Sequence, residues 1–300
     1  MTAPGPCADP HRSWPAIEHA TSRRQDRVPF VIDSLVVGSV ARVHVEALRA
    51  FQRDLQVTDD RVALTVPESA RDAALAAINT RLRAQGLIRA WRDETYPLVD
   101  PLIQRVLARF ERAASRFWGT LTFGAHATGW VAAADGRPAR MWVAQRAFDK
   151  ATDPGAFDNL VGGGVPHGQT PFETLVREGW EEAGLRPEVV QRATPGRVIR
   201  LQRDIPEGLQ FEWIHAFDLQ LQPGEQPLNQ DGEVHAFTLH PTPEALALAA
   251  SALMTTDAAL VTLDFALRHR LFDPATHDAL SARAAGLWVG AAAGPGAAPP

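Results

Sequence analysis

The sequence predicts an α+β protein in two parts: a sandwich of strands and helices, and a smaller α+β unit that precedes it. The length of 300 residues favours two domains. In the second half, strand patterns come first, a central helix and more strands follow, and helices close the chain. That order is typical of an α+β or an α/β sandwich. Hydrophobic residues make up 45% of the chain, which is enough for a sizeable core.

The first half carries the patterns of a small α+β domain, predicted over residues 16–118. Apolar runs bounded by turn residues predict strands at 29–41, 61–66 and 87–91. Apolar residues at helical spacing predict helices at 44–55, 67–85 and 101–117. The last of these helices has the clearest pattern, with Leu102, Val106, Leu107 and Phe110 on one side. We recognise no catalytic chemistry in this domain.

The second half is predicted to form a separate domain over residues 119–275. Strands are expected at 121–133, 140–147, 197–203, 211–221 and 234–239. The pair Asp135-Gly136 predicts a hairpin turn between the first two strands. Helices are expected at 170–183, 243–254 and 257–270.

The two ends of the chain are expected to be disordered. Residues 1–15 are rich in proline and small residues, which cannot bury enough apolar surface to order a segment. The tail over residues 276–300 includes a low-complexity stretch of Ala, Gly and Pro from Gly286 onward.

Charge and hydropathy exclude several classes of partner. The formal net charge is -5, so the chain as a whole does not indicate a nucleic-acid partner. We find no apolar run long enough to span a bilayer and no signal-peptide pattern, so we expect no membrane partner. The single cysteine, Cys7, cannot form an intramolecular disulfide, which fits a reducing compartment. We therefore expect a cytoplasmic location.

A strong helix-start signal lies at Thr170. Thr170 can cap the helix, Pro171 suits the first helical position, and Glu173 completes a capping box. Gly184 can end the helix in a left-handed conformation.

Inside this helix, Glu178, Glu181 and Glu182 lie on one face because their offsets are three and four residues. Three carboxylates so placed repel one another, and they suit a hard cation such as Mg²⁺ or Mn²⁺. The alternative is a solvated acidic face. The glycines at 162–164 favour the metal, because they let the backbone approach a cation or a phosphate closely.

The spacing of this segment closely resembles the Nudix box. Gly163 is followed after five residues by Gln169, and after seven more by the run from Arg177 to Leu185. Two positions depart from the family pattern: Gln169 replaces a glutamate and Gly179 replaces an aliphatic residue. We expect these departures to affect loop rigidity and packing before metal binding.

The resemblance implies a Nudix α/β/α sandwich and a metal-dependent attack of water on a phosphoanhydride. It implies that Glu178, Glu181 and Glu182 hold Mg²⁺ or Mn²⁺ and that Arg177 orients these glutamates. The Gly163 carbonyl would be a further metal ligand. The implied partner is a small-molecule diphosphate substrate.

A distal loop in this superfamily often supplies another carboxylate. The run Asn229-Gln230-Asp231-Gly232-Glu233 is the candidate loop here, with Glu233 preferred over Asp231 as a metal ligand. The alternative is a polar turn that precedes the strand at 234–239.

A narrower resemblance points to one Nudix branch. It resembles the Nudix portion of fungal thiamine pyrophosphokinase fusions, whose preceding domain has no assigned function. The matching runs are Phe123–Gly129, Trp142–Arg146 with Lys150, Asp231–Val234 and Asp264–His269. The resemblance implies damaged thiamine diphosphate analogues, converted to monophosphates, as substrates.

Four side chains near these motifs are candidate substrate contacts. Lys150 and Arg146 could bind phosphate, although basic residues near a hairpin are often only solvated. Trp142 and Trp213 could stack on a ring, although an aromatic residue in a strand more often belongs to the core. His126 on a strand is similarly more often structural.

Several alternatives remain at this point. Isopentenyl diphosphate isomerases share the Nudix fold but require a cysteine near the metal, and the only cysteine here is Cys7. A Nudix module that binds a ligand without turnover typically loses box glutamates, and all three are present. A nucleotide or nucleotide-sugar diphosphatase remains open. The first domain either shapes the substrate pocket or forms a homodimer.

Overall fold

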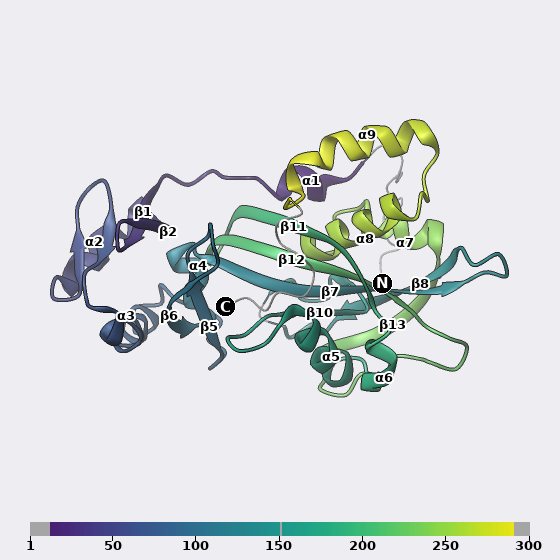
Figure 1. Ribbon diagram of the computed structural model, residues 1–300, viewed down its shortest axis with the longest axis horizontal. Coiled ribbons are helices and arrows are strands. Elements are labelled where there is room, and N and C mark those ends of the chain that lie inside the picture. The colour runs from purple at the N-terminus through teal and green to yellow at the C-terminus, as the bar shows by residue number, and fades with distance from the viewer. Residues whose placement is uncertain (1–12, 151, 291–300) are drawn as a thin grey trace.

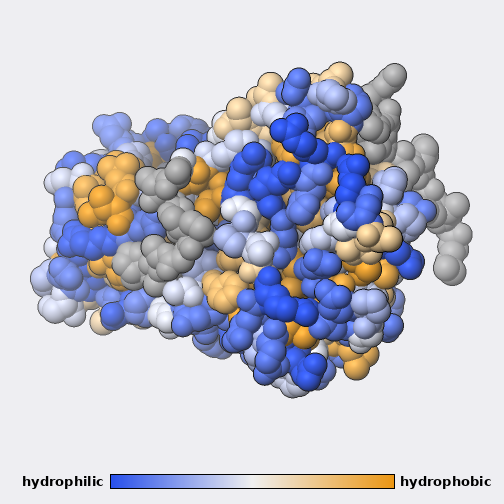
Figure 2. Space-filling view, turned by 45° about the vertical axis from the view of Figure 1, so that its right-hand side comes forward, coloured by the Kyte–Doolittle hydropathy of each residue, from blue (hydrophilic) through white to orange (hydrophobic). Residues whose placement is uncertain are grey.

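The computed structural model describes residues 13–150 and 152–290, which form a smaller and a larger unit side by side (Figure 1). The predictions for residues 1–12 and 291–300, including Cys7, lie outside this range. Among the described residues, no helix is both long and apolar enough to cross a membrane. The face drawn in Figure 2 is mainly hydrophilic, with apolar residues in separate patches.

The smaller unit combines a four-stranded sheet, a long helix and a hairpin. The sheet has the order β2-β1-β4-β3. The strands are β1 (Arg27–Ile32), β2 (Leu35–Ala41), β3 (Leu55–Val57) and β4 (Val62–Leu64). The helices are α2 (Val45–Leu48), α3 (Arg71–Ala84) and α4 (Ala114–Trp118), with 3-10 turns at Arg42–His44, Arg49–Phe51 and Glu68–Ala70. The hairpin consists of β5 (Thr95–Val99) and β6 (Val106–Glu111).

Three predictions for this unit differ from the structure. The helix expected at 101–117 is wrong, because β6 pairs with β5 in antiparallel register and only α4 is helical. The strand expected at 87–91 is wrong as well, since the strand of this region is β5. The helix expected at 44–55 is confirmed only for α2 and the flanking 3-10 turns, and Leu55 begins β3.

The larger unit is built on a seven-stranded mixed sheet. Its main path is β11-β12-β7-β8-β13, with β10 paired to β7 and β9 paired to β8. The strands are β7 (Leu121–Ala132), β8 (Pro138–Arg146), β9 (Phe157–Asp158), β10 (Val161–Gly164), β11 (Thr194–Ile205), β12 (Gly208–Gln220) and β13 (Val234–Pro241). The helices are α5 (Pro171–Glu181), α6 (Pro187–Val190), α7 (Thr242–Ala249), α8 (Thr256–Arg268) and α9 (Pro274–Ala284), with a final 3-10 turn at Ala285–Leu287.

Helices cover both faces of this sheet (Figure 1). One apolar cluster joins α5 and α6 to β7, β10 and β12. A second cluster joins α7, α8 and α9 to β8, β11 and β12. The layers confirm the predicted α/β/α sandwich within an α+β protein, and the hairpin turn at Asp135-Gly136 is present, with φ of +81° at Gly136.

Both ends of the chain are more ordered than expected within the described range. Trp14 is 1% exposed and packs with α1 (Pro15–His19) in the same core cluster as α8. Residues of the expected tail form α9, whose Asp273 cap accepts a hydrogen bond from the Thr276 N–H at 3.1 Å. The start signal Asp273-Pro274 and the helix-forming alanines that follow explain this helix.

The smaller unit contacts the larger one through α4, which packs on β12. The Arg116 carbonyl oxygen lies 2.1 Å from the position that a Cβ on Gly208 would occupy. Only glycine permits this approach, which places the end of β6 and α4 beside the turn between β11 and β12.

Candidate active site

Helix α5 begins and ends where the sequence predicts. Thr170 Oγ1 accepts a hydrogen bond from the Glu173 N–H at 3.1 Å, and Glu173 Oε2 accepts one from the Thr170 N–H at 2.8 Å. Gly184 follows the helix with φ of +60° and donates its N–H to the Trp180 carbonyl at 3.0 Å. The capping box and the glycine end therefore fix the register of the helical glutamates.

The helix places two glutamates against the glycine strand β10. A Cβ on Gly163 would lie 2.4 Å from Glu178 Oε1, so the Glu178 side chain rests directly on that backbone. Glu182 Oε2 accepts a hydrogen bond from the Gly162 N–H at 3.3 Å. Glu181 is more open, with 46% of its side chain exposed. The structure thus brings Glu178, Glu182 and Gly163 together, with Glu181 at the rim.

Arg177 links the glutamates to the loop before the helix. Its guanidinium contacts Glu178 at 2.7 Å and Glu181 at 2.6 Å. Its Nε donates to Gln169 Oε1 at 3.3 Å, and that oxygen also accepts from Thr174 Oγ1 at 3.0 Å. Gln169 therefore offers Arg177 a neutral acceptor where the family pattern has a carboxylate.

The second departure from the box is explained by packing. Gly179 is buried in α5, and a Cβ there would lie 2.7 Å from Val190 Cγ2 of α6. Val190 fills the space that an aliphatic residue at 179 would need.

The ionised forms of Glu178 and Glu182 are destabilised in this site. Burial raises the pKa of Glu178, although Arg177 opposes the rise. Burial and the neighbouring Glu178 charge raise the pKa of Glu182 well above its usual value. Two partly buried carboxylates with this mutual repulsion are the donor set that a hard divalent cation stabilises. In the described chain, however, no three acidic, histidine or cysteine side chains are already gathered closely enough to form a metal cage.

Glu233 and Lys150 pair with each other. Lys150 Nζ donates to Glu233 Oε2, and Arg92 of the smaller unit lies 3.9 Å from the other carboxylate oxygen. Burial would raise the pKa of Glu233, but the Lys150 hydrogen bond and charge outweigh it and lower that pKa. Lys150 is also close enough to Glu182 to oppose the rise of its pKa. The two predicted residues are therefore engaged with each other.

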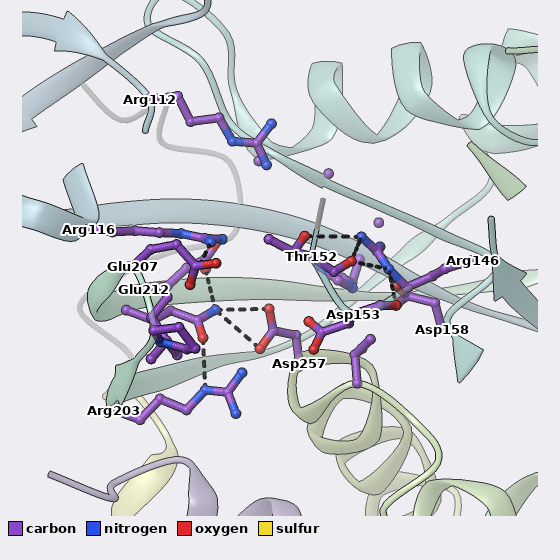
Figure 3. A pocket seen from close by; sticks show the side chains of 18 residues that line it. Arg112, Arg116, Arg146, Thr152, Asp153, Asp158, Arg203, Glu207, Glu212 and Asp257 are labelled. Atoms are coloured by element: carbon purple, nitrogen blue, oxygen red, sulfur yellow. Dashed lines mark hydrogen bonds and ion pairs between the residues drawn. The ribbon is translucent and has the colours of Figure 1, made fainter. Parts of the chain in front are cut away.

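A cavity of about 330 Å³ lies beside β10, and Figure 3 shows the side chains that line it. Its wall includes the backbone of the three glycines of β10. Four arginines and five carboxylates also line it: Arg112, Arg116, Arg146, Arg203, Asp153, Asp158, Glu207, Glu212 and Asp257. The box glutamates adjoin this space through β10 rather than lining it.

An amide joins the two carboxylates at one end of the cavity. Gln210 Nε2 donates to Glu212 Oε2 at 2.9 Å and to Asp257 Oδ2 at 3.0 Å, while its Oε1 accepts from Arg203 Nε at 2.9 Å. Burial raises the pKa of Glu212, and the Asp257 charge raises it further. Glu212 Oε1 lies 2.8 Å from the Cβ position of Gly124, and the Gly163 carbonyl oxygen lies 3.7 Å from the same point. Glu212 and the Gly163 carbonyl are therefore neighbours.

The remaining predicted contacts fall into two groups. Arg146 lines the cavity, where it pairs with Asp158 at 3.0 Å. Trp142 and Trp213 pack against the core cluster under α5 and are absent from the cavity wall. His126 lines the cavity and shares a hydrogen bond of 3.1 Å with Asn159 Oδ1.

Several wall residues have no local sequence pattern that marks them as site residues. Glu212 lies in a strand of mostly apolar residues, and Asp257 resembles an ordinary acidic residue of a helix start. Arg112 and Arg116 come from the smaller unit, in a segment that the sequence predicts as one helix. An acidic residue inside a mostly apolar strand is the one available signal, and Asp218 of the same strand shares it although it pairs with Arg268 and does not line the cavity.

Family models cover most of the chain. Residues 12–122 match a domain of unknown function, DUF4743, and residues 123–259 match the NUDIX domain. The boundary between the two matches falls at the start of β7.

Two curated relatives from Arabidopsis thaliana match both parts. Nudix hydrolase 20, chloroplastic, is 33% identical over 262 residues, which cover 82% of this chain and 69% of the relative. Nudix hydrolase 24, chloroplastic, is 32% identical over 255 residues, with the same coverage. Among solved structures, DR0079 from Deinococcus radiodurans aligns with a TM-score of 0.44 and 20% identity, covering 57% of this chain and 99% of that one.

Proposed function

The chain belongs to the Nudix hydrolase family and is a pyrophosphohydrolase, and we propose that it cleaves a phosphoanhydride of a small organic diphosphate bound in the cavity beside β10. The observation that carries this proposal is the position of Glu178 and Glu182. Both carboxylates meet the glycine strand that also forms the cavity wall.

The donor set fits a divalent cation. Glu178 and Glu182, with Glu181 at the rim and the Gly163 carbonyl, would hold Mg²⁺ or Mn²⁺. Such a cation, when bound, neutralises phosphate charge and lowers the pKa of water.

The chain's own residues orient the substrate and the carboxylates. Arg177 fixes Glu178 and Glu181 by its two ion pairs. Arg146 and Arg203 add positive charge to the cavity wall, which attracts an anionic substrate, while Asp158 and Gln210 hold their guanidinium groups in place. Burial and the Asp257 charge raise the pKa of Glu212 although the Gln210 hydrogen bond opposes the rise, so Glu212 is a stronger base than an exposed glutamate.

The cavity favours a small substrate. Its volume of about 330 Å³ lies at the lower end of the range for small-molecule sites. Arginines and carboxylates line the same space, so it suits a molecule with an anionic end and a cationic or hydrogen-bond-donating ring.

Damaged thiamine diphosphate analogues are our preferred substrates, hydrolysed to monophosphates. They combine a diphosphate with rings that donate and accept hydrogen bonds, and the runs Phe123–Gly129 and Asp231–Val234 support this choice by their resemblance to the branch fused to thiamine pyrophosphokinase in fungi. A panel with Mg²⁺ or Mn²⁺ would include thiamine diphosphate, its oxidised analogues, nucleotide sugars and dinucleotides. Preferred turnover of a nucleotide sugar would overturn the thiamine assignment. Tight binding without turnover would indicate a silent module.

The role of the box is tested by Glu182→Gln. The substitution keeps the side-chain shape but removes a charge, so kcat should fall by at least about 100-fold, as when one charge-stabilising group is lost from an active site. The melting temperature should not fall, because the exchange relieves the repulsion with Glu178. Glu188→Gln, an exposed change on α6, is the matched control and should keep full activity. Near-normal turnover by Glu182→Gln would refute the assignment.

A further inference from the structure

Two arginines of the smaller unit reach the cavity of the larger one. Arg112 follows β6 directly, and Arg116 lies on α4. Both line the cavity, and Figure 3 shows Arg112 entering it from the side away from Arg203 and Asp257. The domain of unknown function therefore forms part of this wall.

Arg112 is held against the glycine strand. Its Nη2 lies 3.2 Å from the Cβ position of Gly164, the residue next to Gly163. Its Nη1 donates to Glu94 at 3.1 Å, and its guanidinium lies 5.4 Å from the centre of the Tyr96 ring. Arg112 therefore lies against the backbone of β10 in a position that Glu94 and Tyr96 fix.

Arg112 keeps hydrogen-bonding capacity directed at the cavity. Within the described residues, Nη2 and Nε of Arg112 donate no hydrogen bond, while Nη1 is occupied by Glu94. Arg116 has one loose ion pair, with Glu207 at 3.8 Å. Two guanidinium groups with free donors stand on the same wall.

The charge balance of the cavity shows why these donors matter. Five carboxylates line it, and they would repel an anionic substrate. Arg146 is already bound to Asp158 and to the backbone of Thr152, and Arg203 is bound to Gln210 and Thr256. Arg112 and Arg116 are the less engaged cations of this wall.

We propose that the smaller unit is a working part of the active site, in which Arg112 and Arg116 bind the diphosphate group of the substrate. This inference rests on the proposed function and assigns its phosphate contacts. A guanidinium binds phosphate oxygens through two parallel hydrogen bonds, so Arg112 positions the diphosphate beside β10 while Glu94 holds the guanidinium in place.

The test measures Mg²⁺-dependent binding of methylenediphosphonate, a diphosphate analogue that cannot be hydrolysed, by calorimetry. Losing a charge-assisted hydrogen bond should weaken binding by about 10- to 100-fold in Arg112→Gln. Arg112→Lys keeps the charge but cannot form two parallel hydrogen bonds, so its affinity for the analogue should lie between those of Arg112→Gln and the wild type. Arg105→Gln changes an exposed arginine of the same unit, outside the cavity wall, and should bind like the wild type.

Two further variants separate substrate binding from a structural role. Glu94→Gln weakens the anchor of Arg112 but keeps the guanidinium, so it should retain most of the binding. A loss in Glu94→Gln equal to that in Arg112→Gln would show that the ion pair alone matters and would overturn the inference. Arg116→Gln should weaken binding as well. This variant tests the same wall independently, and it keeps the test valid if Arg112→Gln proves unstable.

The outcomes also distinguish this inference from the proposed function. With a substrate from the panel, Arg112→Gln should raise KM more than it lowers kcat, whereas Glu182→Gln should lower kcat. Normal binding and KM in both arginine variants, with Glu182→Gln inactive, would refute the inference and leave the function intact. If the wild type hydrolyses no substrate of the panel but binds the analogue in a way that depends on Arg112, the proposed function is refuted and the assignment of the phosphate contact stands. No binding by the wild type would refute the inference.

Discussion

At the scale of single residues, each glycine of β10 faces a different side chain. A Cβ on Gly162 would lie 2.7 Å from His126 Nδ1, and one on Gly163 would lie 2.4 Å from Glu178. A Cβ on Gly164 would lie 1.8 Å from the Tyr96 hydroxyl of the smaller unit. Side chains alternate in direction along a strand, so groups from both sides approach this backbone.

Gly164→Ala should therefore disturb the contact between the two units. The new methyl group cannot coexist with the Tyr96 hydroxyl, and overpacking of this kind costs about 1 to 3 kcal/mol of unfolding free energy. Urea unfolding of the variant measures this loss. Activity should fall too, because Arg112 Nη2 lies 3.2 Å from the same position.

Tyr96→Phe provides the matched partner for this change. It removes the clashing oxygen, which is buried and has no hydrogen-bond partner in the described structure. The double variant should recover part of the stability that Gly164→Ala loses, since Tyr96 Cζ still lies 3.1 Å away. Strictly additive effects of the two substitutions would show that the contact is absent in solution.

The same scale shows what the sequence could predict of the site. Glu178 and Glu182 follow from spacing along one helix, and the structure places them together with Gly163. Arg112 and Glu212 reach the cavity through tertiary packing between segments far apart in the chain. A local sequence pattern cannot predict contacts between segments so far apart in the chain.

At the scale of elements, residues 101–117 show how pairing overrides periodicity. The apolar spacing fits a helix, yet Leu102 is 84% exposed and Phe110 is paired opposite Tyr96 across the hairpin. Asp100 builds the turn: its side chain accepts from the Leu102 N–H at 2.8 Å, and its N–H donates to the Arg105 carbonyl at 2.9 Å. An Asp-Pro pair is a turn signal that outweighs four apolar residues at helical spacing.

Helix α8 is fastened to the sheet by a buried carboxylate. The Asp264 side chain is fully buried and contacts Arg268 at 2.8 Å and Arg197 of β11 at 3.2 Å. Arg268 also contacts Asp218 of β12 at 2.5 Å. These ion pairs connect the helix to two neighbouring strands.

Asp264→Ala should lower the free energy of unfolding by about 1.5 to 3 kcal/mol, because it removes the carboxylate that binds both Arg197 and Arg268 while Asp218 still pairs with Arg268. Urea denaturation at neutral pH measures the effect. Asp278→Ala, which changes an exposed residue of α9, should shift stability by less than about 0.5 kcal/mol. If Asp264→Ala lowered the free energy of unfolding no more than Asp278→Ala does, the ion pairs of Asp264 would add little to stability.

At the scale of the whole molecule, the two ends of the described chain fasten to the same face of the larger sheet. Gln202 of β11 donates its N–H to the Ala20 carbonyl at 2.8 Å, and Arg283 of α9 contacts Glu18 at 2.6 Å. The segment before the smaller unit thus packs on the larger one. Sequence order predicted two consecutive units, but it could not show that the first few residues cross over to the second.

This architecture couples the cation to the stability of the larger unit. A ligand that binds only the folded state stabilises it by about 2.7 kcal/mol when its concentration is 100 times Kd. Mg²⁺ or Mn²⁺ should therefore raise the melting temperature of the wild type, measured against KCl at equal ionic strength. This rise in melting temperature should be larger than for a cation bound by solvent-exposed carboxylates, because the cation also relieves the repulsion between Glu178 and Glu182.

Glu182→Gln should lose most of this thermal gain, while Glu188→Gln should keep it. Since the uncharged variant also lacks the repulsion, its melting temperature without the cation should equal or exceed that of the wild type. Without the cation the variant should therefore melt at the same or a higher temperature than the wild type, and with the cation the wild type should melt at the higher temperature. Equal gains in the wild type and Glu182→Gln would place the cation elsewhere in the protein, and the assignment of the box carboxylates as its ligands would then be wrong.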